Sequence, residues 1–192
     1  AIGLLYKIRP YVNKKILKML YYSLVYSHLN YVVEVWGSAD EIYLDRILIL
    51  QKRIVRMLTH NDIRQPDFSF PPSNPLFLKL EILKIQDIFK MNIAKFIYKC
   101  LNKNTPNDFH KWFTLTTQVH NHNTRSKFTD SDALINTKNL FIHTARTSHY
   151  GLKKIKVQGA KIWNKIPANI RINNSFGVFN KELKSHLIAN YK

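Results

Sequence analysis

Two histidines and an arginine stand close together in the stretch HNHNTR, where the residue types come nearest to those of an enzyme site. His120 and His122 alternate, so an extended backbone would place both imidazoles on one side, where they could bind zinc. No nearby carboxylate or cysteine completes a zinc ligand set, and we therefore predict no metal site. In the competing interpretation Asn123 and Thr124 fix a turn by bonding their own backbone, with Arg125 either paired inside the protein or presented to phosphate.

Catalytic motifs are missing from the rest of the sequence. It contains no Gly-rich phosphate loop, no HExxH motif and no Cys-based nucleophile site, and its acidic residues are too scattered for a two-metal cluster. We therefore expect no catalytic residue, no cofactor and no small-molecule substrate. A nuclease built around HNHNTR is a further hypothesis, which metal-dependent cleavage lost in His120→Ala would support.

A basic amphipathic helix is the clearest single element, and it follows the aromatic turn YVVEVWGS. Ser38 or Asp40 is expected to cap its first turn. At about 100° per residue, one arc of the helix is apolar, while the opposite arc is cationic except at Ile49. The apolar arc holds Leu44, Ile47, Leu48, Leu50, Ile54, Val55 and Leu58, and the cationic arc holds Arg46, Lys52, Arg53 and Arg56. Such a face is either a solvated surface or a contact with the backbone of a nucleic acid.

The charge of the chain indicates a polyanionic partner. Its 192 residues include 30 Lys and Arg against 12 Asp and Glu, a formal net charge of +18, and 45% of the residues are hydrophobic, as in a globular protein. From Lys138 to the end, basic residues face a single acidic one, Glu182. Nucleic acid is the leading candidate partner, although an acidic protein would satisfy the same charge.

A second basic region has aromatic residues interleaved with lysines. Lys153, Lys154 and Lys156 lie between Tyr150 and Trp163, so phosphate contacts and stacking on unpaired bases are both conceivable there. No zinc-finger, homeodomain or RNP signature is present. We therefore expect recognition of backbone and shape rather than of base sequence.

Cysteine usage and hydropathy bear on the compartment. The single cysteine, Cys100, excludes a disulfide framework and suits a reducing environment, so an intracellular protein of the nucleus or cytoplasm is expected. No long apolar run lacks charges, and no membrane span is predicted. The opening AIGLLYKIRP is not a signal peptide, and we expect the chain to be part of something longer.

The remaining patterns predict a mainly α fold with two parts. Residues 1–105 should form a helical domain: Asn13 caps one helix, another spans 85–101, and Gly37, free to adopt a positive φ, follows Trp36, which anchors two helices. Residues 106–192 should form a small basic α+β domain. There LFIHTART and LKKIKVQ are expected as strands, Gly159 opens a short helix that carries Trp163, and Ser175 caps a last helix.

Six phrases in order resemble the region downstream of the polymerase core in reverse transcriptases of non-LTR retrotransposons, of the jockey-like kind. These phrases are YVVEVWGS, LDRILILQKRIVRMLT, PLFLKLEILKIQDIFKMNIAKFIYK, HNHNTR, GAKIWNKIP and FNKELKSHL, and together they span nearly the whole chain. The resemblance implies that Pro10 to Leu58 corresponds to the thumb, a helical unit that closes on the template-primer duplex.

In that family the helix with Arg46, Lys52, Arg53 and Arg56 would contact the duplex backbone. The palm of such an RNA-directed DNA polymerase lies upstream, and neither YADD nor FADD occurs here, so this chain alone should not polymerise. The resemblance implies the upstream polymerase core of the same polyprotein, element RNA and target DNA as partners. A decayed or host-adopted fragment that binds an acidic protein is the alternative.

Overall fold

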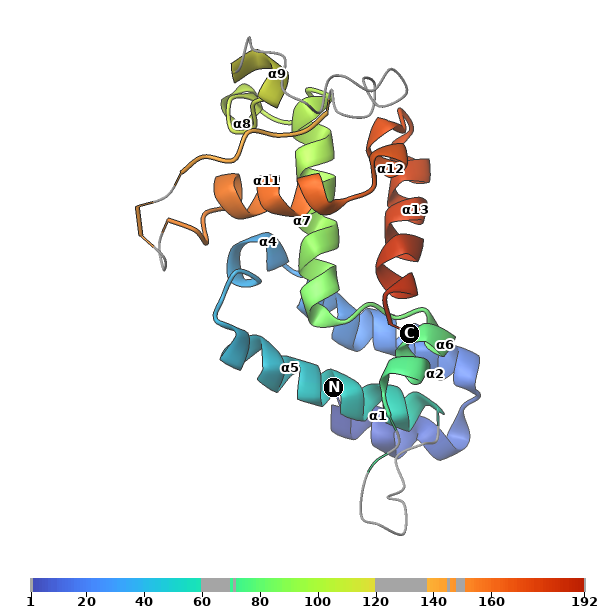
Figure 1. Ribbon diagram of the computed structural model, residues 1–192. Helices are drawn as coiled ribbons and strands as arrows, with labels where there is room; N and C mark the ends of the chain where they lie inside the picture. The colour runs from blue at the N-terminus through green and yellow to red at the C-terminus, as the bar shows by residue number, and fades with distance from the viewer. Residues whose placement is uncertain are drawn as a thin grey trace. The chain divides into compact units, whose positions relative to one another are not determined.

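The computed structural model describes residues 2–59, 70, 72–119, 138–144, 146–147 and 151–191, and these are mostly helical (Figure 1). The mainly α fold predicted from the sequence is confirmed. Contacts divide the chain into two compact units: unit 1 comprises Ala1–Phe89 and His186–Lys192, and unit 2 comprises Lys90–Ser185. The boundaries of these units in the chain differ from those of the predicted domains, 1–105 and 106–192. The predicted domains stay a prediction.

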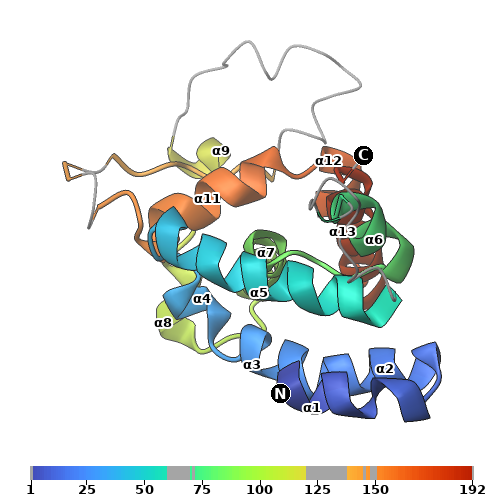
Figure 2. The ribbon, with the colours of Figure 1, turned by 90° about the horizontal axis from the view of Figure 1, so that it is seen from below.

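Unit 1 is built from short helices packed around one long helix, α5. Figures 1 and 2 both show α5 beside α1 and α2. The helices of unit 1 are α1 (Ile2–Ile8), η1 (Arg9–Tyr11), α2 (Lys14–Tyr21), η2 (Tyr22–Tyr26), α3 (Ser27–Asn30), α4 (Val33–Trp36), α5 (Glu41–Thr59) and α6 (Asn74–Leu80), with the first residues of α7 (Ile85–Leu101) and the last of α13 (Phe176–Ala189).

The start of α2 has the cap that the sequence predicts. The Asn13 side chain accepts a hydrogen bond from the N–H of Ile16 at 2.9 Å, which satisfies one of the donors that a helix leaves open at its first turn. The helical run then passes through η2, a π-helical turn, before α3. Tyr22 packs edge-on against Tyr21 and Tyr26 at this turn, with ring centroids 5.4 and 5.3 Å apart.

A buried glutamine on α5 holds the core of unit 1 together. Gln51 Nε2 donates to the carbonyl of Leu83 at 2.7 Å and to the Tyr21 hydroxyl at 3.1 Å. Gln51 Oε1 accepts from the N–H of Ile85 at 3.0 Å. The amide thereby joins α5, α2 and the segment between α6 and α7. Without it, the carbonyl of Leu83 and the N–H of Ile85 would be buried without these hydrogen bonds.

The predicted reason for a glycine at position 37 is wrong. Gly37 adopts a φ of −69°, and the positive φ of this turn falls instead on Val32, at 48°. What requires glycine is space, since a Cβ on Gly37 would lie 2.5 Å from Phe89 Cδ2 and 2.5 Å from the carbonyl oxygen of Val33. The neighbouring Trp36 donates from Nε1 to the carbonyl of Tyr31 at 2.7 Å, which ties the end of α4 to the turn before it.

Unit 2 packs several helices around the rest of α7. Its helices are α8 (Asn107–His110), α9 (Thr116–Val119), α11 (Ile155–Lys165) and α12 (Ala168–Ile172), with most of α7 and α13. Figure 1 shows α11 crossing α7. Gly159 lies at this crossing, where an added Cβ would come within 3.2 Å of Ile97 Cδ1 and 3.3 Å of Phe113 Cε1. The absence of a side chain therefore lets the two helices approach closely.

The α+β character predicted for the C-terminal half is not confirmed. Within the described residues, β pairing is confined to one antiparallel bridge between Leu115 and Leu140. The second predicted strand is wrong, because Ile155 to Gln158 form the first turn of α11, and Gly159 lies inside that helix rather than opening it. Val157, Ala160 and Trp163 recur at helical spacing and are buried, so packing of this helical stripe prevails over the short alternation of LKKIKVQ.

Candidate nucleic-acid-binding surfaces

The start of α11 concentrates positive charge. Lys154 is the N-cap residue, no side chain caps the helix, and its first turn contains no acidic residue. The carbonyl of Lys154 accepts from the N–H groups of Val157 and Gln158, both at 2.9 Å. Lys154 and Lys156 are exposed, and Lys153 is half-buried. Three lysines thus surround the positive end of a helix dipole, where an acidic group would ordinarily be favoured.

An aromatic ring lies beside this cationic end. The Lys156 ammonium lies over the Trp112 ring, 5.1 Å from its centroid. Trp112 is half-buried and packs edge-on against Phe109 at 4.8 Å and against Phe96 at 6.3 Å. The aromatic cluster fixes where the Lys156 side chain lies, so this lysine is presented from a well-packed support.

The other end of α11 is anchored by the adjacent residues Trp163 and Asn164. Trp163 is 1% exposed, and its Nε1 donates to the carbonyl of Lys138 at 2.9 Å. The Asn164 side chain accepts from the N–H of Leu140 and donates to the Leu140 carbonyl, both at 2.9 Å. Trp163 therefore lies in the core and joins α11 to the segment around residue 139, so its ring is not exposed for stacking on an unpaired base.

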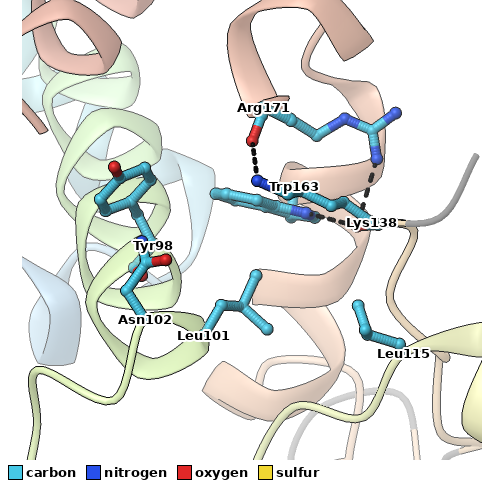
Figure 3. A pocket seen from close by; sticks show the side chains of 7 residues that line it. All are labelled: Tyr98, Leu101, Asn102, Leu115, Lys138, Trp163 and Arg171. Atoms are coloured by element: carbon cyan, nitrogen blue, oxygen red, sulfur yellow. Dashed lines mark hydrogen bonds between the residues drawn. The ribbon is translucent and has the colours of Figure 1, made fainter. Parts of the chain in front are cut away.

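Lys138 and Arg171 form a reciprocal clasp beside a small pocket of about 130 Å³ (Figure 3). Arg171 NH1 donates to the Lys138 carbonyl and to Asn139 Oδ1, while Lys138 Nζ donates to the carbonyls of Arg171 at 3.3 Å and Ile172 at 3.5 Å. The ammonium thereby neutralises the negative end of α12. Burial lowers the pKa of Arg171 below the usual arginine value. The clasp has a structural role, because the side chain of each cation donates to the main chain of the other.

The four basic residues of α5 that are predicted to contact nucleic acid differ in exposure. Arg46 and Arg53 are exposed, whereas Lys52 and Arg56 are half-buried. The Arg56 guanidinium lies over the Phe70 ring, 5.0 Å from its centroid, and burial lowers the pKa of Arg56. A solvated row of four equivalent cations is therefore not what the fold presents. That these residues contact a duplex backbone stays a prediction.

Some predicted features lie outside the residues that the structure describes. These are His120, His122 and Arg125 of the HNHNTR stretch, and Tyr150. In the parts of the chain that are described, no three His, Cys, Asp or Glu side chains gather into a group that could hold a metal ion. The same parts contain no helix that is long and apolar enough to cross a bilayer.

Three residues of this region were not singled out from the sequence. Trp112 supports Lys156, Asn164 pins Leu140, and Arg171 clasps Lys138. The aromatic residues that neighbour Trp112 in the sequence could have indicated an aromatic cluster there. For Asn164 and Arg171 no spacing gives the partner, because both bond backbone groups that are more than 20 residues away.

Comparisons with protein-family models, with curated proteins and with solved structures give no match to this chain. The resemblance to reverse transcriptases therefore rests on the six sequence phrases alone.

Proposed function

We propose that this chain is a non-catalytic nucleic-acid-binding module that contacts the phosphate backbone without sequence preference. The observation that carries the proposal is the start of α11, where Lys153, Lys154 and Lys156 surround an N-terminus with no side-chain cap and no acidic residue in its first turn. A helix N-terminus offers backbone N–H groups to an anion, and lysines add the salt-sensitive attraction that dominates nucleic-acid affinity.

The position of Trp112 supports the same proposal. A ring beside Lys156 provides an apolar surface next to the cations, which suits a sugar or a base that follows a bound phosphate. The formal charge of +18 would speed encounter with any polyanion and would keep the affinity strongly dependent on ionic strength.

The sequence resemblance suggests the larger protein to which this module would belong. In the proposed setting it is the C-terminal part of a non-LTR retrotransposon reverse transcriptase, acts in the nucleus or cytoplasm, and grips the template-primer duplex, element RNA or target DNA beside an upstream polymerase core. Catalysis belongs to that core, and this chain supplies binding only.

Binding of the purified chain to a labelled RNA/DNA hybrid, to single-stranded RNA and to duplex DNA at several salt concentrations tests the proposal. We expect log affinity to fall linearly with log salt and to be similar for unrelated sequences. Absence of binding to all three at low salt would exclude a nucleic-acid-binding function.

An acidic protein is a second candidate partner, and a specific observation favours it. The outer face of α5 is not purely cationic, because large apolar side chains are exposed between its arginines. This face is a separate surface from the start of α11.

A further inference from the structure

Six exposed positions on one side of α5 form a mixed apolar and cationic surface, the outer stripe. It consists of Ile42, Tyr43, Arg46, Ile49, Leu50 and Arg53, all of them exposed. Its apolar members range from 45% exposed at Leu50 to 69% at Ile42. At about 100° per residue the six fall within one arc, and the acidic residues Glu41 and Asp45 fall outside it.

The spacing inside the outer stripe is that of a helix-pairing seam. Ile42, Arg46, Ile49 and Arg53 are separated by four, three and four residues, the alternation found in the heptads of coiled coils. Aliphatic residues thus alternate with arginines along two heptads, while Tyr43 and Leu50 flank the seam on one side. A second helix lying along α5 would cover this seam.

The composition of the outer stripe matches a protein interface better than a phosphate contact. The side chains of Arg46 and Arg53 make no hydrogen bond, ion pair or ring contact within the described part of the chain. Arginine, tyrosine and large aliphatic side chains are the groups that carry binding energy at protein interfaces. Phosphate binding gives no reason to expose two isoleucines and a leucine between the arginines.

An apolar pocket adjoins the outer stripe within unit 1. It has a volume of about 170 Å³ and is lined by residues of α5 and of the helices beside it, among them Leu24, His28, Ile47 and Leu50. Leu50 belongs both to the pocket and to the stripe. A large apolar side chain of a helix bound along the stripe could enter this pocket at the Leu50 side.

We propose that the outer stripe of α5 docks an acidic amphipathic α-helix of a partner protein. Its aliphatic residues lie against Ile42 and Ile49, and its glutamates pair with Arg46 and Arg53. Two arginines seven residues apart are about 10.5 Å apart along the axis, so the glutamates are also seven residues apart. A second copy of this chain is disfavoured as the occupant, because it would bring the same arginines and a net charge of +18.

The test uses the full chain and a designed helical peptide of about three heptads, with leucine at its seam and two glutamates placed opposite the arginines. Fluorescence anisotropy measures its affinity for the wild type and for Arg46→Glu/Arg53→Glu. We expect the double variant to lose about thirtyfold or more in affinity for this peptide. A peptide with lysines in place of the two glutamates should bind the double variant and not the wild type.

Two controls separate docking from general charge effects and from misfolding. Lys14→Glu/Lys15→Glu makes the same charge change on exposed residues of α2 and should leave peptide affinity within about twofold. Ile42→Ser/Ile49→Ser keeps the arginines and should also abolish binding, with an unchanged circular dichroism spectrum. The proposal is overturned if the glutamate peptide fails to bind, if Arg46→Glu/Arg53→Glu binds it as the wild type does, or if the lysine peptide does not restore binding.

A nucleic-acid role for the outer stripe is the remaining outcome, and it too overturns the proposal. In that case Arg46→Glu/Arg53→Glu would lose affinity for the RNA/DNA hybrid while no peptide binds. The docking proposal does not rest on the proposed nucleic-acid function, since that function depends on the start of α11.

Discussion

The side chain of Asn164 pairs with the backbone of Leu140 in the way that a neighbouring β-strand would. Its side-chain amide accepts from the N–H of Leu140 and donates to the Leu140 carbonyl, both at 2.9 Å. On the other side of the same segment, the Phe141 N–H donates to the carbonyl of Thr114, and the Thr116 N–H donates to the carbonyl of Asn139, both at 2.9 Å. The segment is therefore held between a true bridge and a side chain that mimics one, which satisfies its buried backbone without a sheet.

Replacing Asn164 by aspartate should destabilise the fold. The carboxylate keeps an acceptor for the Leu140 N–H but faces the Leu140 carbonyl with a second acceptor, so one hydrogen bond is lost and two oxygens repel each other. We expect Asn164→Asp to lower the free energy of unfolding by about 1–3 kcal/mol in urea denaturation. Asn174→Asp, the same change at an exposed side chain, should have little effect; equal losses in both variants would contradict the bracing role of Asn164.

Gly37 and Gly177 should respond oppositely to substitution by alanine. A Cβ on Gly37 would meet the Val33 carbonyl oxygen, a backbone atom that cannot move aside cheaply, so Gly37→Ala should cost about 1–3 kcal/mol. A Cβ on Gly177 in α13 would come no closer than 3.9 Å to Ser175 Oγ. Gly177→Ala should therefore stabilise by about 0.4–1 kcal/mol through the unfolded chain.

Thermal denaturation of the two glycine variants beside the wild type gives the comparison. A Gly37→Ala variant as stable as the wild type would mean that the turn after α4 relaxes away from Phe89. The φ of −69° at Gly37 is accessible to alanine, so any loss reports crowding and not backbone strain.

Stability should fall in alkaline solution because of Tyr191. Its hydroxyl donates to Asp87 Oδ2 at 2.6 Å and accepts from the N–H of Lys84 at 2.9 Å. Burial, and then the charge of Asp87, raise the pKa of Tyr191 far above the ordinary tyrosine value of 10.0. Above about pH 10 the unfolded chain releases this proton while the folded chain keeps it, so the free energy of unfolding decreases as the pH rises.

Tyr191→Phe isolates that contribution. The variant should lose about 1–2 kcal/mol at neutral pH with the two hydrogen bonds. Between pH 10 and 11 the stability of the variant should fall by about 1 kcal/mol less than that of the wild type, because the unfolded chain is only partly ionised at Tyr191 in this range. Urea denaturation at a series of pH values measures both effects, and parallel pH profiles for the two proteins would show that Tyr191 ionises normally in the folded chain.

Local signals in the sequence were enough for α2, α5 and α7, but not for α1, and the stretch that contains α4 was predicted as a turn. Asn13 caps α2 because a short acceptor side chain precedes an apolar stripe, and α5 buries Leu44, Ile54, Val55 and Leu58 of its predicted apolar arc. The outward side of α5 was harder to interpret. The pattern placed Leu50 on the packing arc, yet Leu50 is 45% exposed, because packing partners cover only the part of that arc around Leu44, Ile54 and Val55.

The errors in unit 2 come from contacts between distant residues. The stretch LKKIKVQ is too short for its alternation to exclude a helix, and the buried face of Val157, Ala160 and Trp163 is decided by α7 crossing at Gly159. The roles of Asn164, Arg171 and Gln51 could not be predicted either. Each is a polar side chain that bonds backbone more than 20 residues away, and sequence spacing carries no such information.

The most direct test of phosphate binding at the start of α11 compares two triple variants in their affinity for an RNA/DNA hybrid across a salt series. Lys153→Gln/Lys154→Gln/Lys156→Gln removes the cations at the start of α11, and Lys161→Gln/Lys165→Gln/Lys181→Gln removes as many exposed cations elsewhere in unit 2. We expect the first variant to bind more weakly, with a log-log salt slope shallower by about one for each lost phosphate contact, while the second keeps the slope of the wild type. Equal slopes for the first variant and the wild type would contradict the claim that the start of α11 binds the nucleic-acid backbone.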